Sequence, residues 1–273
     1  MATLTRTDQV RRIVVVLAEI LCVIGTLVGV GVLGTDVSQT SGGALSADAT
    51  LIAPATTAFS IWTPIYVGLL LHTVWQFLPK NATTERVRST GWLAAVSMVL
   101  NAAWLLVTQQ GWIWVSVVVI LALALTLGVL IARLSRERAA STFEKIFVDG
   151  TFGLYLGWVA VAACANVTAA FVDGDIDLGS IGNQVAAVVL VLVAAALGVV
   201  FAARFGGRWA VAAAMAWGLA WIAVGRLTDE PRSTATAVAA VLAAVLVLAA
   251  AGRFRRDGAV VGADSPTRTR VSA

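Results

Sequence analysis

Long apolar stretches, separated by short polar segments, follow one another along almost the whole chain. Each stretch has about the 20 residues that an α-helix needs to cross the hydrocarbon core of a bilayer. Apolar residues do not alternate with polar ones within them, which favours helices over the strands of a membrane β-barrel. We predict eight spans, at residues 13–34, 57–78, 91–107, 112–132, 148–171, 184–201, 210–224 and 234–251.

The composition agrees with a chain whose surface faces lipid. Hydrophobic residues make up 59% of the 273 positions, charged residues only 12%, and the mean hydropathy is +0.90. In a soluble domain about a quarter of the residues are charged, so this chain could not cover a water-facing surface. The predicted fold class is therefore all-α: a polytopic membrane helix bundle of about eight transmembrane helices, with the lipid bilayer as its first partner.

Charged residues between the spans predict the topology. Basic residues precede the first span and follow the second, fourth, sixth and eighth, whereas the first, third and fifth loops contain none. Because Lys and Arg concentrate in cytoplasmic loops, both termini are expected in the cytoplasm. The net charge of +4 therefore reflects topology and does not indicate a nucleic-acid partner. The seventh loop is mixed, with Arg226 and Arg232 flanking Asp229 and Glu230. The Ala- and Arg-rich composition favours a bacterial plasma membrane as the location.

The sequence contains no recognisable catalytic motif. It has one histidine, no Gly-x-Ser-x-Gly, no phosphate-binding Walker loop and no cluster of metal ligands. Cys22 and Cys164 lie in different spans at different depths, which argues against a disulfide or a metal site. We therefore predict a protein that is not an enzyme and that has no catalytic residues, no metal and no cofactor of its own.

Aromatic and amide side chains recur on one face of three spans. Helical spacing places Phe59, Trp62 and Tyr66 together in the second span, and Asn101 and Trp104 together in the third. In the fifth span a stripe at three- and four-residue steps contains Tyr155, Trp158, Ala162 and Asn166. With the predicted topology these faces lie in the outer half of the bilayer, with Trp158 nearer the middle. They predict a mostly apolar pocket with a few orienting polar groups, lined by Phe59, Trp62, Tyr66, Asn101, Trp104, Trp158, Ala162 and Asn166.

Two alternatives to a pocket stay open at this point. Tryptophan near a membrane boundary often serves as an interfacial anchor, which would fully explain Trp92, Trp112 and Trp114. An asparagine within a span often links helices through a hydrogen bond and has no further role.

The three segments resemble the TspO/MBR family, the tryptophan-rich sensory proteins related to the mitochondrial translocator protein. The family pattern W-T-x-L-Y is approached by Trp62-Thr63-Pro64-Ile65-Tyr66, and L-N-x-x-W is matched by Leu100, Asn101 and Trp104. The pattern W-V-x-x-A-x-x-L-N is matched at Trp158, Val159, Ala162 and Asn166, with Ala165 in place of the Leu. The sequence departs from the family at Pro64, at Ile65 and at Ala170, where an aromatic residue is expected.

The resemblance covers residues 13–171 and implies a five-helix unit that binds a flat hydrophobic ligand, such as a porphyrin (tetrapyrrole or haem-like) or a sterol-like molecule. The pocket would lie beneath the first loop, whose residues 35–50 would form a flexible lid, and the role would be sensory or transport. Residues 1–12 are then a cytoplasmic N-terminus, 172–252 three additional transmembrane helices, and 253–273 a disordered cytoplasmic tail. A homodimer is a candidate assembly.

Two ionisable residues lie well inside spans, where a charge is costly and calls for a partner or a function. Glu19 and His72 are each about two turns from the cytoplasmic end of their spans. Antiparallel packing of the two spans would make them a candidate proton-linked pair, and the chain would then be a proton-coupled transporter of small amphipathic solutes. Interfacial placement or a single hydrogen bond is the simpler explanation of both residues. A third hypothesis is light- or oxygen-dependent turnover of a bound tetrapyrrole.

Two Gly-x-x-x-Gly pairs, Gly25 with Gly29 and Gly153 with Gly157, are candidates for close helix packing.

Overall fold

The computed structural model describes residues 3–137 and 139–263, and this part of the chain contains helices and no strands. Eight of its helices are long and apolar enough to cross a membrane, which confirms the predicted fold class. A short 3₁₀ segment leads into α2, and α6 is preceded by α5 (Thr142–Glu144) and the π-helical segment Lys145–Gly150. The long helices are α1 (Arg6–Gly29), α2 (Trp62–Trp75), α3 (Glu85–Gln109), α4 (Ile113–Arg136), α6 (Thr151–Asp173), α7 (Gly179–Phe205), α8 (Trp209–Thr228) and α9 (Thr234–Ala263).

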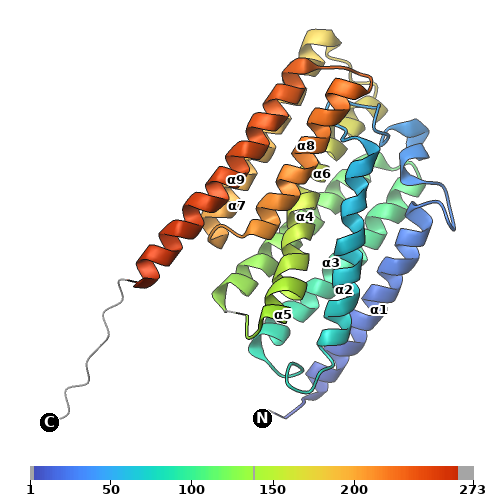
Figure 1. Cartoon of the computed structure of the whole chain (residues 1–273). Coiled ribbons are helices and arrows are strands. Elements are labelled where there is room, and N and C mark those ends of the chain that lie inside the picture. The colour runs from blue at the N-terminus through green and yellow to red at the C-terminus, as the bar shows by residue number, and fades with distance from the viewer. Residues whose placement is uncertain (1–2, 138, 264–273) are drawn as a thin grey trace.

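Five helices form a closed ring (Figure 1). Helix α1 packs on α3, α3 on α4, and α4 on α6, and α2 closes the ring by contacting both α6 and α1. The remaining helices form a second layer, in which α8 packs on α6 and α9 lies between α8 and α7. Helix α6 therefore belongs to both layers, and it is the most deeply buried of the eight spans.

Both glycine pairs lie at helix contacts, as the sequence predicts. An added Cβ at Gly25 would lie 3.0 Å from Ala102 of α3, and one at Gly29 would lie 2.4 Å from Leu105. A Cβ at Gly157 would lie 2.3 Å from the Val211 carbonyl oxygen of α8. Small residues thus allow close approach of α1 to α3 and of α6 to α8, which joins the two layers.

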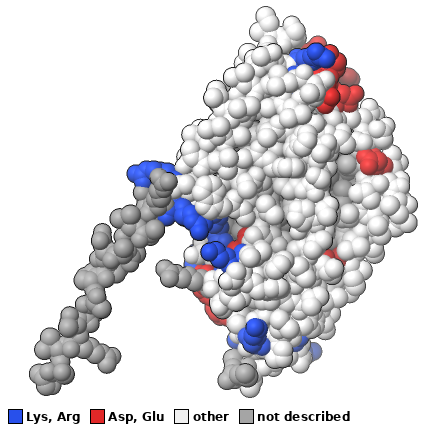
Figure 2. Space-filling model, viewed as in Figure 1, with Lys and Arg blue, Asp and Glu red and all other residues white. Residues whose placement is uncertain are grey.

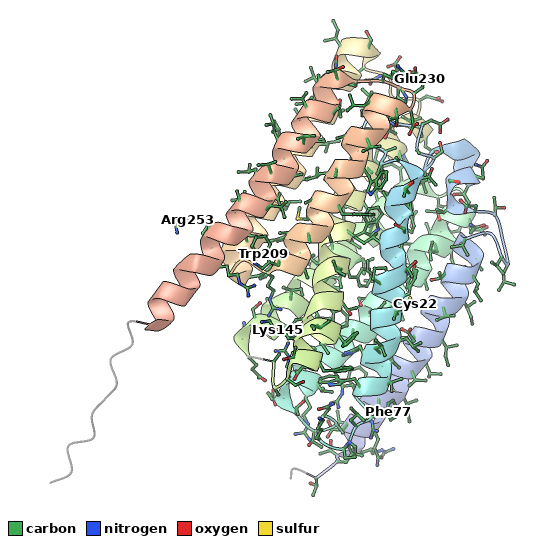
Figure 3. All side chains as sticks on the ribbon, viewed as in Figure 1. Cys22, Phe77, Lys145, Trp209, Glu230 and Arg253 are labelled. Atoms are coloured by element: carbon green, nitrogen blue, oxygen red, sulfur yellow. The ribbon has the colours of Figure 1, made fainter. Side chains whose placement is uncertain are left out.

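The two ends of the bundle carry different loops. We call the end that carries residues 30–55, 174–178 and 229–233 the first-loop end, and the opposite end the N-terminal end. Figure 3 shows Glu230 at the first-loop end and Phe77 at the N-terminal end, with Cys22 about midway. Charged side chains gather toward the ends and leave most of the visible sides without charge (Figure 2).

Buried ion pairs hold the N-terminal end together. Asp8 bonds Arg11 at 2.7 Å and Arg88 of α3 at 2.6 Å. It also completes a capping box with Thr5, which explains why α1 begins at Arg6.

A second ionic network links α3 to the segment that precedes α6. Arg86 pairs with Glu144 at 2.7 Å and with Asp149, and Arg208 reaches Asp149 at 3.4 Å. An unpaired charge in an apolar environment is costly. Because these charges pair with one another, the helices can pack closely around them.

Several helix boundaries differ from the predicted spans, and three of these differences matter for the argument below. The first helix ends at Gly29, where the chain turns, instead of continuing to residue 34. Helix α8 continues to Thr228 instead of ending at 224, so Arg226 lies in its last turn. Helix α9 continues to Ala263, so residues 253–263 are helical and not part of a disordered tail. The rest of that predicted tail, 264–273, lies outside the described residues.

Candidate functional site

A cavity lies inside the ring of five helices, beneath the first loop. It has a volume of about 60 Å³. Helices α3, α4 and α6 and the entry to α2 provide its walls, and residues 37–54 of the first loop cover it. Its lining residues are Val37, Ala44, Leu45, Ser46, Thr50, Ala53, Pro54, Phe59, Trp62, Asn101, Trp104, Ile120, Leu123, Trp158, Val159, Val161, Ala162, Ala165, Asn166 and Ala169.

Aromatic rings form one side of this cavity. Trp62 stacks on Tyr66 with ring centroids 5.1 Å apart and meets Trp158 edge-on at 6.3 Å. Phe59 packs edge-on against Trp158 at 5.6 Å. These are favourable arrangements for aromatic pairs, so the rings fix one another's orientation before any ligand is present.

Asn166 is the centre of a polar network between α3, α4 and α6. Its Oδ1 accepts a hydrogen bond from Trp104 Nε1 at 2.7 Å, and its Nδ2 donates to Ser116 Oγ at 2.9 Å. Ser116 in turn donates to the Ile113 carbonyl at 2.7 Å. The network holds the Trp104 ring at the cavity wall and satisfies an amide that is only 2% exposed.

Asn101 also links helices at the cavity wall. Its Nδ2 donates to the Tyr66 hydroxyl at 3.1 Å and lies 3.5 Å from Cys22 Sγ. This contact joins α3 to α2 and α1, and it sets the position of the ring on which Trp62 stacks.

The structure therefore brings the eight sequence-predicted site residues together. Seven of them line the cavity, while Tyr66 lies behind Trp62 and contacts Asn101. Sequence reasoning missed the contribution of α4, whose Ile120 and Leu123 form part of the wall and whose Ser116 bonds Asn166. Serine in an apolar span gives little signal, because it can bond its own helix backbone.

The first loop follows a defined path over the cavity. It contains 3₁₀ turns at Val37–Gln39 and Ser41–Gly43, and Gly42 and Gly43 have left-handed φ values of 64° and 85°. Near its end, Ser46 donates to the exposed Asp48 carboxylate. This bond lowers the pKa of Asp48, and the nearby positive charge of Arg226 acts in the same direction.

Glu19 and His72 are not brought together. Both are buried, yet no hydrogen bond or salt bridge joins them in the described part of the chain. The His72 ring instead packs against Trp75 at 5.8 Å and Phe152 at 5.0 Å, between α2 and α6. Depth along the axis was similar for the two residues, but depth does not determine which way each side chain faces.

No group of three or more potential metal ligands is present among the described residues.

Comparison with known proteins identifies the family. No curated protein and no solved structure matches the chain. The family model for TSPO-like proteins matches residues 13–252. This match extends through α7, α8 and most of α9, the helices that the sequence analysis treated as an addition to a five-helix unit. Since it covers nearly the whole helical bundle, together with the aromatic and amide motifs on α2, α3 and α6, we conclude that the chain belongs to the TSPO-like protein family.

Proposed function

We propose that this membrane protein binds a flat hydrophobic ligand, a porphyrin or a sterol-like molecule, in the cavity beneath the first loop, in a sensory or transport role. The observation that supports the proposal is the convergence of Phe59, Trp62, Trp104 and Trp158 with two amides around one mostly apolar cavity. Small-molecule sites commonly combine such apolar walls with a few fixed polar groups.

The aromatic rings and the amides would contact different parts of the ligand. Trp62 and Trp158 stand nearly perpendicular, with an interplanar angle of 82°, so a flat ligand stacked on one meets the edge of the other. Asn101 and Asn166 are already held by Tyr66, Trp104 and Ser116, so they would orient a polar substituent without reorganising.

Binding requires the site to enlarge. The cavity volume of about 60 Å³ corresponds to roughly two water molecules, whereas ligand pockets usually have about 300–1,000 Å³. The first loop is the part of the wall built from short turns and not from packed helices, so its displacement is the least costly way to make room.

Tryptophan fluorescence tests this proposal. Adding protoporphyrin IX to the purified full-length chain in detergent is expected to quench emission saturably. Trp158→Leu should weaken the apparent affinity by about tenfold or more, since ring stacking contributes roughly 0.5–1.5 kcal/mol beyond the apolar area that is also lost. Trp112→Leu is the matched control, because Trp112 is exposed and does not line the cavity.

A competitor identifies the ligand class. If a sterol displaces bound protoporphyrin IX in proportion to its concentration, the two molecules share the cavity. Equal affinity of wild type, Trp158→Leu and Trp112→Leu for both probes would remove the site assignment.

A further inference from the structure

A second, larger hollow opens at the first-loop end, outside the ring of five helices. It has a volume of about 690 Å³ and lies between residues 49–51, the end of α6, the start of α7 and the α8–α9 connection. We call it the outer chamber. Leu51, Phe171, Ile176 and Leu178 give it an apolar side, and Gln184, which donates to Ser233 at 3.2 Å, gives it a polar one. Its volume falls in the range of ligand sites.

One residue lines both the outer chamber and the aromatic cavity. Thr50 lines both spaces, and its Oγ1 accepts a hydrogen bond from Thr168 Oγ1 of α6 at 3.3 Å. Thr50 is buried, so its side chain fills the boundary instead of projecting into solvent. A shift of the backbone at Thr50 would join the two spaces.

Arg226 of α8 holds this backbone in place. Its Nη1 donates to the Thr50 carbonyl at 2.7 Å and its Nη2 to the Ala47 carbonyl at 2.8 Å. The guanidinium is only 1% exposed, and within the described part of the chain it forms no ion pair with a carboxylate. A buried cation that donates to two loop carbonyls favours the closed position of the loop, because opening would break both of these bonds.

The segment on the other side of Thr50 is fixed to the same helix. Ala55 N donates to the Trp221 carbonyl at 3.1 Å, and Trp217 Nε1 donates to the Ala58 carbonyl at 2.9 Å. On the side toward α1, Gly42 and Gly43 can change φ and ψ at low cost. The loop is thus anchored after residue 53 and can hinge near residue 42, and the Arg226 bonds lie between these points.

We propose that residues 47–50 form a gate between the outer chamber and the aromatic cavity, and that Arg226 is the positioning residue that keeps this gate closed. The proposed ligand would enter from the outer chamber as the Arg226 bonds break, and Thr168 would release Thr50 in the same movement. Helix α8 would thereby control access to a cavity that it does not line. This inference rests on the proposed function for its ligand.

Rates of binding distinguish a gate from a part of the site. In Arg226→Lys the charge is kept, but a single ammonium cannot reproduce the forked bonds to two carbonyls. We expect the association and dissociation rates of protoporphyrin IX, measured by stopped-flow quenching, both to rise about tenfold, the factor expected from one lost charge-assisted bond. The dissociation constant should stay within about twofold, because both rates share one barrier.

Arg133→Lys is the matched control, since Arg133 donates to the Ser89 carbonyl at the opposite end of the bundle. It should leave both rates unchanged. A loss of affinity in Arg226→Lys at an unchanged association rate would overturn the gate.

Locking the gate gives the opposite effect. The double variant Thr50→Cys with Thr168→Cys, made with Cys22 and Cys164 replaced by alanine, is expected to bind protoporphyrin IX slowly when oxidised and at least tenfold faster after reduction of the same protein. Equal rates in the two states would contradict the proposed route.

A measurement without ligand separates this inference from the proposed function. Backbone hydrogen exchange of residues 44–55 should be about tenfold faster in Arg226→Lys than in wild type and unchanged in Arg133→Lys. Faster exchange without porphyrin binding would reject the proposed function but support the role of Arg226 in keeping the gate closed. Unchanged exchange would reject that role of Arg226 even if porphyrin binds.

Discussion

Asn101 and Asn166 lie on the walls of the cavity, whereas His72 lies in α2 and Gln76 directly follows that helix, toward the N-terminal end. All four side chains are buried in the helix bundle. Their exposed fractions are 1% and 2% for the asparagines and 1% and 0% for His72 and Gln76. The asparagines bond Tyr66, Trp104 and Ser116. The side-chain polar atoms of His72 and Gln76 have no hydrogen-bond partner among the residues that the structure describes.

The difference shows that burial alone does not tell what a polar side chain does for the fold. A bonded amide between helices fixes their relative position, and its loss leaves its partners unsatisfied. A buried polar group without a partner costs desolvation energy and contributes no compensating bond. We therefore expect substitutions to separate the two groups by the sign of their effect on stability.

The largest effect should come from a polar residue at the N-terminal end that does have partners. Arg86→Met leaves Glu144 buried without its cation and removes the pairing to Asp149. Breaking a buried pair in this way costs about 3–5 kcal/mol. Reversible unfolding in mixed micelles measures the loss.

Arg232→Met is the control for Arg86→Met, because the Arg232–Glu230 pair is exposed and such pairs contribute about 0–1 kcal/mol. If both variants lost the same stability, the partners of Arg86 would not be what holds this end.

A smaller loss is expected at the cavity. Asn166→Leu removes the acceptor of Trp104 Nε1 and the donor to Ser116 and should cost about 1–3 kcal/mol. It should also weaken protoporphyrin IX binding, because the Trp104 ring is no longer held at the wall.

A double-mutant cycle with Ser116→Ala checks the cause of that loss. Two residues in one hydrogen-bonded network should give a coupling of about 0.5–3 kcal/mol. Strict additivity of the two substitutions would mean that the Asn166–Ser116 bond contributes nothing.

Sequence spacing was enough to find the aromatic and amide residues, because helical periodicity fixes which side chains share a face. Hydropathy also located the eight spans, since each must bury its backbone in lipid. The same pattern gives depth along a helix but not rotation about it. Glu19 and His72, which were placed at similar depth, therefore turned out not to meet.

Arg226 escaped notice for a related reason. The predicted span ended at residue 224, so Arg226 was counted among the mixed charges of the seventh loop. Its role depends on carbonyls at Ala47 and Thr50, about 180 residues away along the chain. Backbone carbonyls carry no sequence signal, because every residue has one.

The partnerless groups should tolerate substitution. His72→Phe keeps a ring between Trp75 and Phe152 and removes two polar nitrogens, so stability should be unchanged or rise by up to about 1 kcal/mol. Thermal unfolding of the purified chain measures this. His72→Asp is the contrasting variant, since it adds a buried charge and should destabilise.

The same variant addresses the proton-coupled alternative. We expect any solute uptake by vesicles that contain the protein to have the same dependence on a pH gradient in His72→Phe as in wild type. Loss of that dependence would give His72 a function that its lack of partners does not suggest.

The smallest effect should occur where a polar group has partners but is exposed. Asp177, in the connection between α6 and α7, accepts hydrogen bonds from Asn183 Nδ2 at 2.8 Å and from Gly179 N at 2.9 Å. These bonds, the Asn183 bond first, lower the pKa of Asp177. Because the pKa is lower in the folded state, the stabilisation is complete above about pH 4 and is lost as the pH falls through the lowered pKa.

Asn183→Ala should therefore raise the pKa of Asp177 toward its ordinary value, as followed by the carboxyl carbon resonance during a pH titration, and leave the unfolding midpoint at pH 7 unchanged. Water replaces the lost bond at an exposed site, whereas no water replaces it around Asn166. A drop in the midpoint as large as that of Asn166→Leu would mean that burial does not govern the cost. The contrast between bonded and unbonded polar groups would then have to be explained by the helices that they join.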